Sequence, residues 1–136
     1  MATLHLEIVT PEALVYQADV ESVVVPGSEG ELGILPQHVA VMTQIIPGEL
    51  RISRQGQELR MALGEGFLDV QPNRVLILTD MAIDEAEIDE HAAEKAVALA
   101  QQELKNQALS HEEIATIQSS LLRSLAKIRV KRRHPY

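Results

Sequence analysis

The chain has 136 residues, 46% of them hydrophobic but only 2% aromatic, with a net charge of −8 and no cysteine. This composition supports one ordinary domain, or a small domain with an appendage, whose core is built from Val, Ile, Leu and Ala. It excludes a disulfide framework and a thiolate metal site, and the acidic balance argues against nucleic acid as the main partner. No apolar run approaches the roughly 20 residues of a membrane span, so no membrane insertion is expected.

Charge is unevenly distributed along the chain. Residues 1–83 carry 11 acids and 4 bases, residues 84–113 carry 9 acids and 2 bases, and residues 114–136 carry 6 bases and no acid. An acidic protein therefore ends in a basic tip. Such a tip can bind nucleic acid, lipid headgroups or an acidic protein surface, or it can be a solvated tail.

Up to about residue 83 the apolar residues alternate with polar ones or form short β-branched runs. The stretch LHLEIVT places Leu4, Leu6 and Ile8 on one face, and VESVVVP is typical of a buried strand. Further strand-like stretches are VAVMTQII, GELRISR, QELRMAL, GFLDVQ and RVLILTD. Many short strands at roughly 8–12-residue spacing, with no helix between them, predict an antiparallel sandwich or barrel over residues 1–83.

From Asp84 onward the pattern changes, because the chain contains no further glycine and no proline before Pro135. EIDEHAAEKAVALAQQELKNQ is rich in strong helix formers, and Asp84 or Glu87 near its start would favour the helix dipole. A second helix begins where Ser110 and Glu113 have the spacing of a capping box. Residues 84–136 are therefore predicted to form an antiparallel helical hairpin.

Each predicted helix carries an apolar stripe. The second stripe is Ile114, Ile117, Leu121, Leu125 and Ile128. The first stripe is less pronounced and comprises Ile88, Ala92 and Leu99, with Val97 and Ala100 as further candidates. An alanine-rich seam holds a hairpin only weakly, and about 45 helical residues in one extended arm would reach roughly 65–70 Å.

The stretch PGSEGELGILPQH, residues 26–38, has glycines like those of a phosphate-binding loop but not the rest of such a site. Gly33 is followed by Ile-Leu-Pro where a P-loop needs Lys and Ser or Thr, and the glycine spacing is not G-x-G-x-x-G. Glu29 and Glu31 would also repel a phosphate. We interpret the stretch as a connection that presents Glu29, Glu31 and His38; the alternative is an ordinary turn between strands.

Longer motifs occur in a distinctive order along the chain. GSEGELGILPQH, GELRI, GEGFLDVQPNRVLILTD and EIDEHAA precede a two-helix tail. In these motifs, and along essentially its whole length, the chain resembles the epsilon subunits of bacterial F-type ATP synthases, which are called delta in mitochondria. The resemblance implies a flattened β-sandwich of about ten short antiparallel strands, followed by an antiparallel α-helical hairpin.

The resemblance also implies a function. Members of this family are non-catalytic rotor subunits of the central stalk, peripheral to the cytoplasmic face of the energy-transducing membrane. Their sandwich lies against the gamma subunit and the polar loops of the membrane c-ring. The matching residues of this sequence are Glu29, Glu31, Gly33, Leu35 and His38.

In the same family the hairpin can extend and restrain rotation, which inhibits ATP hydrolysis. Its basic positions then meet acidic segments of the catalytic alpha and beta subunits. The matching residues are Arg123, Lys127, Arg129, Lys131, Arg132 and Arg133.

Some family members bind ATP on the folded hairpin through an Ile-Asp-x-x-Arg-Ala motif and arginines of the second helix. The matching residues are Asp89, Arg123 and Arg129, but Ala92 replaces the motif arginine, and the acids Glu90 and Glu94 lie nearby. We therefore expect no bound cofactor. The alternative hypothesis is a stand-alone ligand-binding β-sandwich whose hairpin senses ATP.

No catalytic or metal site can be named from the sequence. None of the five histidines belongs to an H-E-x-x-H motif. The run His111-Glu112-Glu113 is more typical of the first turn of a helix than of a metal site. Catalysis by this chain alone is not expected.

Overall fold

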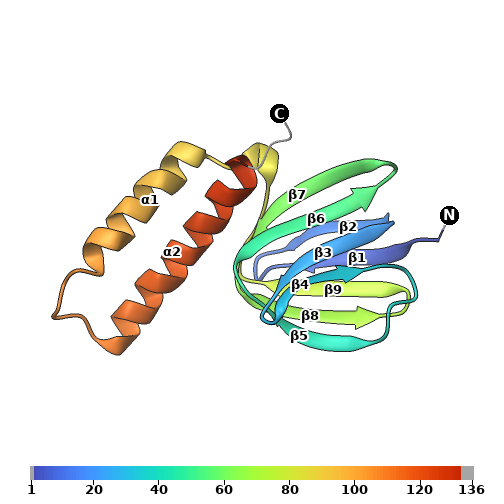
Figure 1. Ribbon diagram of the computed structural model, residues 1–136, viewed down its shortest axis with the longest axis horizontal. Helices are drawn as coiled ribbons and strands as arrows, with labels where there is room; N and C mark the ends of the chain where they lie inside the picture. Colours follow the sequence, from blue (N-terminus) through green and yellow to red (C-terminus); the bar gives the residue numbers. More distant parts are fainter. Residues whose placement is uncertain (1, 133–136) are drawn as a thin grey trace.

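Figure 1 shows a computed structural model, which describes residues 2–132: a β-sandwich with a helical hairpin along one side. The strands are β1 (Leu4–Val9), β2 (Leu14–Val20), β3 (Ser22–Gly27), β4 (Gly30–Ile34), β5 (Val41–Ile45), β6 (Gly48–Arg54), β7 (Gln57–Leu63), β8 (Gly66–Gln71), β9 (Arg74–Thr79) and β10 (Ala82–Asp84). A short 3-10 helix, η1 (Glu85–Glu87), leads into α1 (Glu90–Glu103) and α2 (His111–Arg132).

The ten strands belong to one sheet that folds over itself. Their order is β10-β7-β6-β3-β5-β8-β9-β1-β2, with β4 paired to β3. One ladder departs from the expected antiparallel pairing, because β1 runs parallel to β9. A parallel pair needs a long connection, and the intervening strands β2 to β8 supply it.

The core lies between the two layers of the folded sheet and contains no aromatic residue among its buried members. Leu4, Leu6 and Ile8 were predicted to share a face, and all are at most 1% exposed. The other buried residues of this cluster are Val20, Val23, Val25, Ile34, Ile45, Leu50, Ile52, Met61, Leu63, Leu68, Val70, Val75 and Ile77. Strand alternation in the sequence therefore identifies the core face correctly.

The stretch 26–38, interpreted above as a connection, contains a β-hairpin. Strand β3 continues to Gly27, and β4 pairs with it in a register that places Pro26 opposite Glu31. Gly30 has φ +114°, a conformation that other residues rarely adopt. In β4 the apolar residues Leu32 and Ile34 face the core. This alternation is difficult to recognise in the sequence because glycines occupy two of the other positions of the strand.

Both helices begin with side-chain caps, one at a predicted position and one elsewhere. Ser110 Oγ accepts a bond from Glu113 N, and Glu113 Oε1 accepts one from Ser110 N, both at 3.1 Å, which confirms the capping box. The start of α1 is different from the expected one, because Asp89 accepts a bond from Ala92 N at 3.0 Å. Asp84 instead caps η1.

The predicted apolar stripes match the buried faces of the helices only in part, because Ile88 and Ala100 are buried but most other members of the stripes are not. The buried residues are Ala93 and Ala100 of α1 and Ser124, Ala126 and Val130 of α2. Leu99 and Leu125 are 58% and 42% exposed. Because α2 lies between α1 and the sandwich (Figure 1), its small side chains occupy the closest contacts and its larger ones remain partly exposed.

Candidate functional site

The predicted partner-binding residues lie on one stretch, residues 29–38, which we call the acidic segment. Glu29 lies in the turn between β3 and β4, and Glu31 and Gly33 lie on β4, all exposed. Leu35 and His38 follow β4; Leu35 is 63% exposed, whereas His38 is half-buried. The imidazole Nδ1 of His38 lies 2.7 Å from the carbonyl oxygen of Val39.

Glu31 has an ion pair within the chain. Its Oε2 accepts a hydrogen bond from Arg51 Nη1 at 3.1 Å, and its side chain is 47% exposed. The same nitrogen donates to Oε1 of Glu49 at 3.1 Å. Burial would lower the pKa of Arg51, but the hydrogen bonds to Glu49 and Glu31 outweigh it and raise that pKa above its ordinary value. The guanidinium thus joins an exposed acid to a buried one.

An exposed apolar patch on the outer face of β5, β8 and β9 was not predicted from the sequence. It consists of Met42, Ile46, Phe67 and Leu78, which are 74%, 48%, 55% and 46% exposed. Phe67 pairs with Leu78 on β9 and with Gln44 on β5, so these strands align the patch across the sheet. The sequence does contain a feature that indicates this patch, because the stretches MTQI and GFLDV have apolar residues at positions that face outward as well as at positions that face the core.

A cavity borders this patch where the sandwich meets α2. It has a volume of about 520 Å³, and its lining includes Ile46, Pro47, Phe67 and Leu122. Its mostly apolar walls extend the patch toward the hairpin, so a partner seated on the sandwich can also contact α2.

The hairpin contacts the sandwich through α2, which packs on β6 and β7. The apolar part of this contact is small: Ala62 of β7, Ile88 and Val130 are buried together, with Met81 and Ile83 packed against them. It buries far less apolar surface than the core of the sandwich. Docking of the hairpin therefore depends in part on polar contacts.

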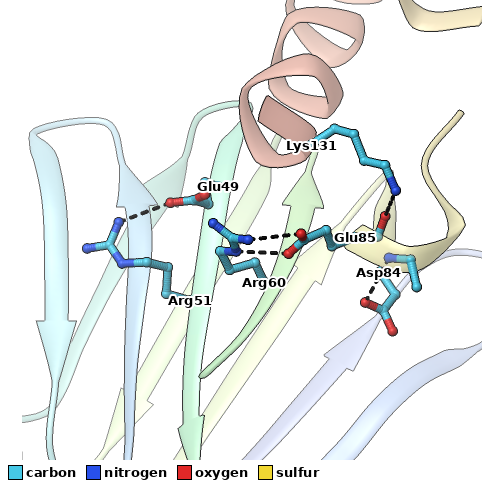
Figure 2. A network of polar contacts seen from close by, with 7 residues as sticks. Glu49, Arg51, Arg60, Asp84, Glu85 and Lys131 are labelled. Atoms are coloured by element: carbon cyan, nitrogen blue, oxygen red, sulfur yellow. Dashed lines mark hydrogen bonds and ion pairs between the residues drawn. The ribbon is translucent and has the colours of Figure 1, made fainter. Parts of the chain in front are cut away.

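Polar contacts cluster around Glu85, the first residue of η1, as Figure 2 shows. Arg60 of β7 donates two hydrogen bonds to its carboxylate, at 2.8 and 2.9 Å, and Lys131 Nζ donates to its carbonyl oxygen at 3.1 Å. Further along α2, Arg123 lies 3.3 Å from Asp80. These contacts join α2 to the sandwich and to the segment that precedes α1.

Three of the six bases of the predicted inhibitory set, Arg123, Lys131 and Arg132, form polar contacts with the protein itself in this conformation. Arg132 donates to Glu90 at 2.6 Å and to Glu94 at 2.9 Å, and the bond from Arg132 lowers the pKa of Glu90. Arg123 and Lys131 make the contacts given above. Lys127 is half-buried between the helices, Arg129 is exposed, and Arg133 lies outside the described residues.

Of the predicted nucleotide-binding residues, only Asp89 lines the cavity between the helices. This cavity of about 200 Å³ is lined by Asp89, Ala92 and Lys127, among others. Its described lining does not include Arg123 or Arg129, and the carboxylate of Asp89 is occupied as the α1 cap. Among the described lining residues there is no arginine to bind a phosphate with two hydrogen bonds.

Residues 2–132 were also searched for membrane-spanning helices and for metal-binding clusters. Within that range no helix is long and apolar enough to cross a membrane. Within the same range no group of three or more His, Asp or Glu side chains could hold a metal ion.

The comparisons with known proteins identify relatives over both halves of the chain. A sequence profile for the ATP synthase delta/epsilon chain beta-sandwich domain matches residues 3–85. The ATP synthase epsilon chain of Laribacter hongkongensis is 45% identical over 73 residues, which are 52% of this chain and 52% of that relative, so the match spans about half of its length. The ATP synthase epsilon chain of Delftia acidovorans is 40% identical over 134 residues, covering 98% of this chain and 96% of that one.

A solved structure has the same fold. The match is in the cryo-EM structure of the Euglena gracilis mitochondrial ATP synthase, OSCP/F1/c-ring in rotational state 1. The TM-score is 0.76 at 25% identity, over 90% of this chain and 77% of the matched one. With the profile match over the sandwich and the Delftia relative over nearly the whole length, the chain belongs to the delta/epsilon chain family of ATP synthases.

Proposed function

We propose that the chain is a non-catalytic central-stalk subunit of an F-type ATP synthase, coupling the catalytic sector to the membrane c-ring as a peripheral part of the complex. Support comes from the Delftia epsilon chain, which is similar over 98% of this chain, and from the Euglena assembly, whose title names F1 and the c-ring. On this proposal the cytoplasmic side of the energy-transducing membrane is its place of action.

The apolar patch is the observation that carries this proposal. Phe67 and Met42 are 55% and 74% exposed on one outer face of the sandwich, and the hairpin packs on β6 and β7 instead. A contiguous apolar surface of this kind marks an interaction site. The patch is the docking surface for the gamma subunit.

The acidic segment is the second contact. Glu29 and Glu31 are exposed in or next to the β3–β4 turn, and Leu35 and His38 follow them in the chain. Carboxylates at a rim steer association with a basic partner and set its register. The polar loops of the c-ring are that partner.

The hairpin restrains ATP hydrolysis when it leaves the sandwich. Its apolar contact with the sandwich is small, and Arg123, Lys131 and Arg132 are held by polar contacts that water can replace. Exposed ion pairs contribute only about 0–1 kcal/mol each. An opened hairpin would present these bases to the acidic catalytic alpha and beta subunits.

Replacing Phe67 with Asp should weaken binding to the purified gamma subunit by about tenfold or more, because it places a charge at the centre of an apolar contact. Isothermal titration calorimetry measures the effect. Leu14→Asp is the matched control, since Leu14 is 50% exposed on β2, outside the patch. Equal binding by Phe67→Asp and the parent, with circular dichroism showing both folded, would remove the patch from the interface.

No cofactor is part of this proposal, and the ATP-sensing alternative has its own test. Ala92→Arg should strengthen ATP binding by about tenfold, because it adds a guanidinium at the cavity between the helices. Calorimetric titration of ATP into both versions measures this. Sub-millimolar binding by the natural chain, unchanged by the added arginine, would favour the ATP sensor.

A further inference from the structure

Two carboxylates border the apolar patch on the outer face of the sandwich. Asp69 of β8 lies opposite Met42 of β5 on one side and Leu76 of β9 on the other. Leu76 in turn lies opposite Glu7 of β1, so the four residues form one row across the sheet. The row is two positions along β8 from Phe67, a distance of about 7 Å on the same face. We call Asp69 and Glu7 the outer acids; both point outward, since their neighbours along each strand are buried in the core.

The outer acids have no lysine or arginine partner within residues 2–132. Oε1 of Glu7 lies 3.4 Å from Nε2 of His5. Oδ1 of Asp69 accepts a hydrogen bond from the side-chain amide of Gln71 at 3.0 Å. Arg74 is on the same face, opposite His5 and one row further from the patch, where it is exposed. The negative charge of the row is therefore not neutralised by a permanently charged base of this chain.

Acids at the contact between the hairpin and the sandwich have arginine partners instead. Glu85 accepts two hydrogen bonds from Arg60. Asp80 lies 3.3 Å from Arg123 of α2. Where the fold brings its own elements together over these acids, it also supplies the cations. A partner that covers the outer acids must bring cations of its own, because removing a carboxylate from water is costly without a compensating charge and hydrogen bonds.

We propose that the gamma surface seated on the patch is an apolar strip bordered on one side by lysine or arginine side chains, which pair with Asp69 and Glu7. This inference rests on the proposed function for the identity of the partner. The opposite border of the patch, toward α2, also has acids, Glu65 and Asp80, but there Arg123 offsets their charge. The bases of the partner therefore favour the side of the outer acids, which determines which way round the partner sits.

The test is calorimetric titration of the full-length chain with the purified gamma subunit at two ionic strengths, about 0.01 M and about 1 M. Between them the Debye length falls from about 30 Å to about 3 Å. Asp69→Asn combined with Glu7→Gln removes both charges but keeps the shapes of the side chains. It should weaken binding about fivefold at the low ionic strength and less than about twofold at the high one, because partly exposed ion pairs are weak and screened by salt. Asp69→Lys combined with Glu7→Lys should weaken binding more, about twentyfold at the low ionic strength.

Two controls separate this contact from a general effect of charge. Glu58→Gln combined with Glu103→Gln changes the net charge by the same amount at exposed acids of β7 and α1, away from the patch, and should leave binding nearly unchanged. Arg74→Gln removes a base from the outer face and should tighten binding about twofold at the low ionic strength. Circular dichroism and urea unfolding compare the folds of all the variants.

Binding by the doubly neutral variant that equals that of the parent would overturn the proposal, as would a loss that does not depend on salt or that the control pair matches. Should the double variants fail to fold, Arg74→Gln decides, because unchanged or weaker binding in that variant contradicts a basic partner surface. The proposed function is judged separately, by gamma binding of the parent and its loss in Phe67→Asp. Gamma binding that depends on Phe67 but not on the outer acids leaves that function standing and refutes this inference, whereas no gamma binding by the parent contradicts both.

Discussion

Gly66→Ala should lower the free energy of unfolding of the sandwich by about 3 kcal/mol, and the melting temperature by about 10 °C. Gly66 lies on β8 between Ile45 of β5 and Thr79 of β9. A Cβ at this position would overlap the carbonyl oxygen of Leu78 and come within 2.8 Å of the Thr79 Cα. Both are backbone atoms of a paired strand, so the clash can be relieved only by disturbing the ladder.

Gly33→Ala is the matched control for this prediction. Gly33 also lies within a strand, but a Cβ there meets no heavy atom within 4 Å. Urea unfolding followed by circular dichroism compares the two variants. Equal stability of both would mean that β8 and β9 are less closely packed at Gly66 than the structure indicates.

Removing residues 85–136 should raise ATP hydrolysis by the assembled complex about fivefold or more. Coupling free energies between sites are typically about 1–3 kcal/mol, and fivefold corresponds to the lower end of that range. The remaining residues keep all ten strands and the complete main core, whose buried members run from Leu4 to Ile77. The fragment should therefore fold and stay bound through the apolar patch.

The triple substitution of Arg123, Lys127 and Arg129 to alanine is the intermediate variant for this experiment, since it keeps the hairpin but removes bases that face the catalytic subunits in the proposed inhibited state. It should raise hydrolysis more than any single change. A complex that retains the fragment yet hydrolyses ATP at the parent rate would show that the hairpin does not restrain it.

The division between strands and helices could be predicted from the sequence because it depends on local pattern. Alternation identified Leu4, Leu6 and Ile8 as core residues, and the Ser110–Glu113 spacing identified a helix start. The parallel pairing of β1 with β9 could not be predicted. It joins strands distant in sequence, and local periodicity carries no information about such pairs.

The candidate surfaces were harder to predict, because their residues come together only in the fold. In the sequence Phe67 and Met42 are simply parts of two strand-like stretches, and only the register of β5 with β8 shows that they share the outer face. The ion pairs of Arg51 could not be predicted from the sequence, since Glu31 lies on a different strand, β4, and Glu49 lies on its own strand. Helix periodicity likewise missed Val130, because α2 has two neighbours and its buried face follows the sheet.

The most direct test of the central-stalk assignment is isolation of an affinity-tagged full-length chain from detergent-solubilised membranes of its own source, with its companions identified and quantified by mass spectrometry. The assignment predicts gamma, the c-ring and the catalytic subunits in fixed proportion to the tagged chain, with Phe67→Asp depleting all of them and Leu14→Asp depleting none. Recovery of the chain free of these subunits, under conditions that keep the rest of the ATP synthase assembled, would contradict it.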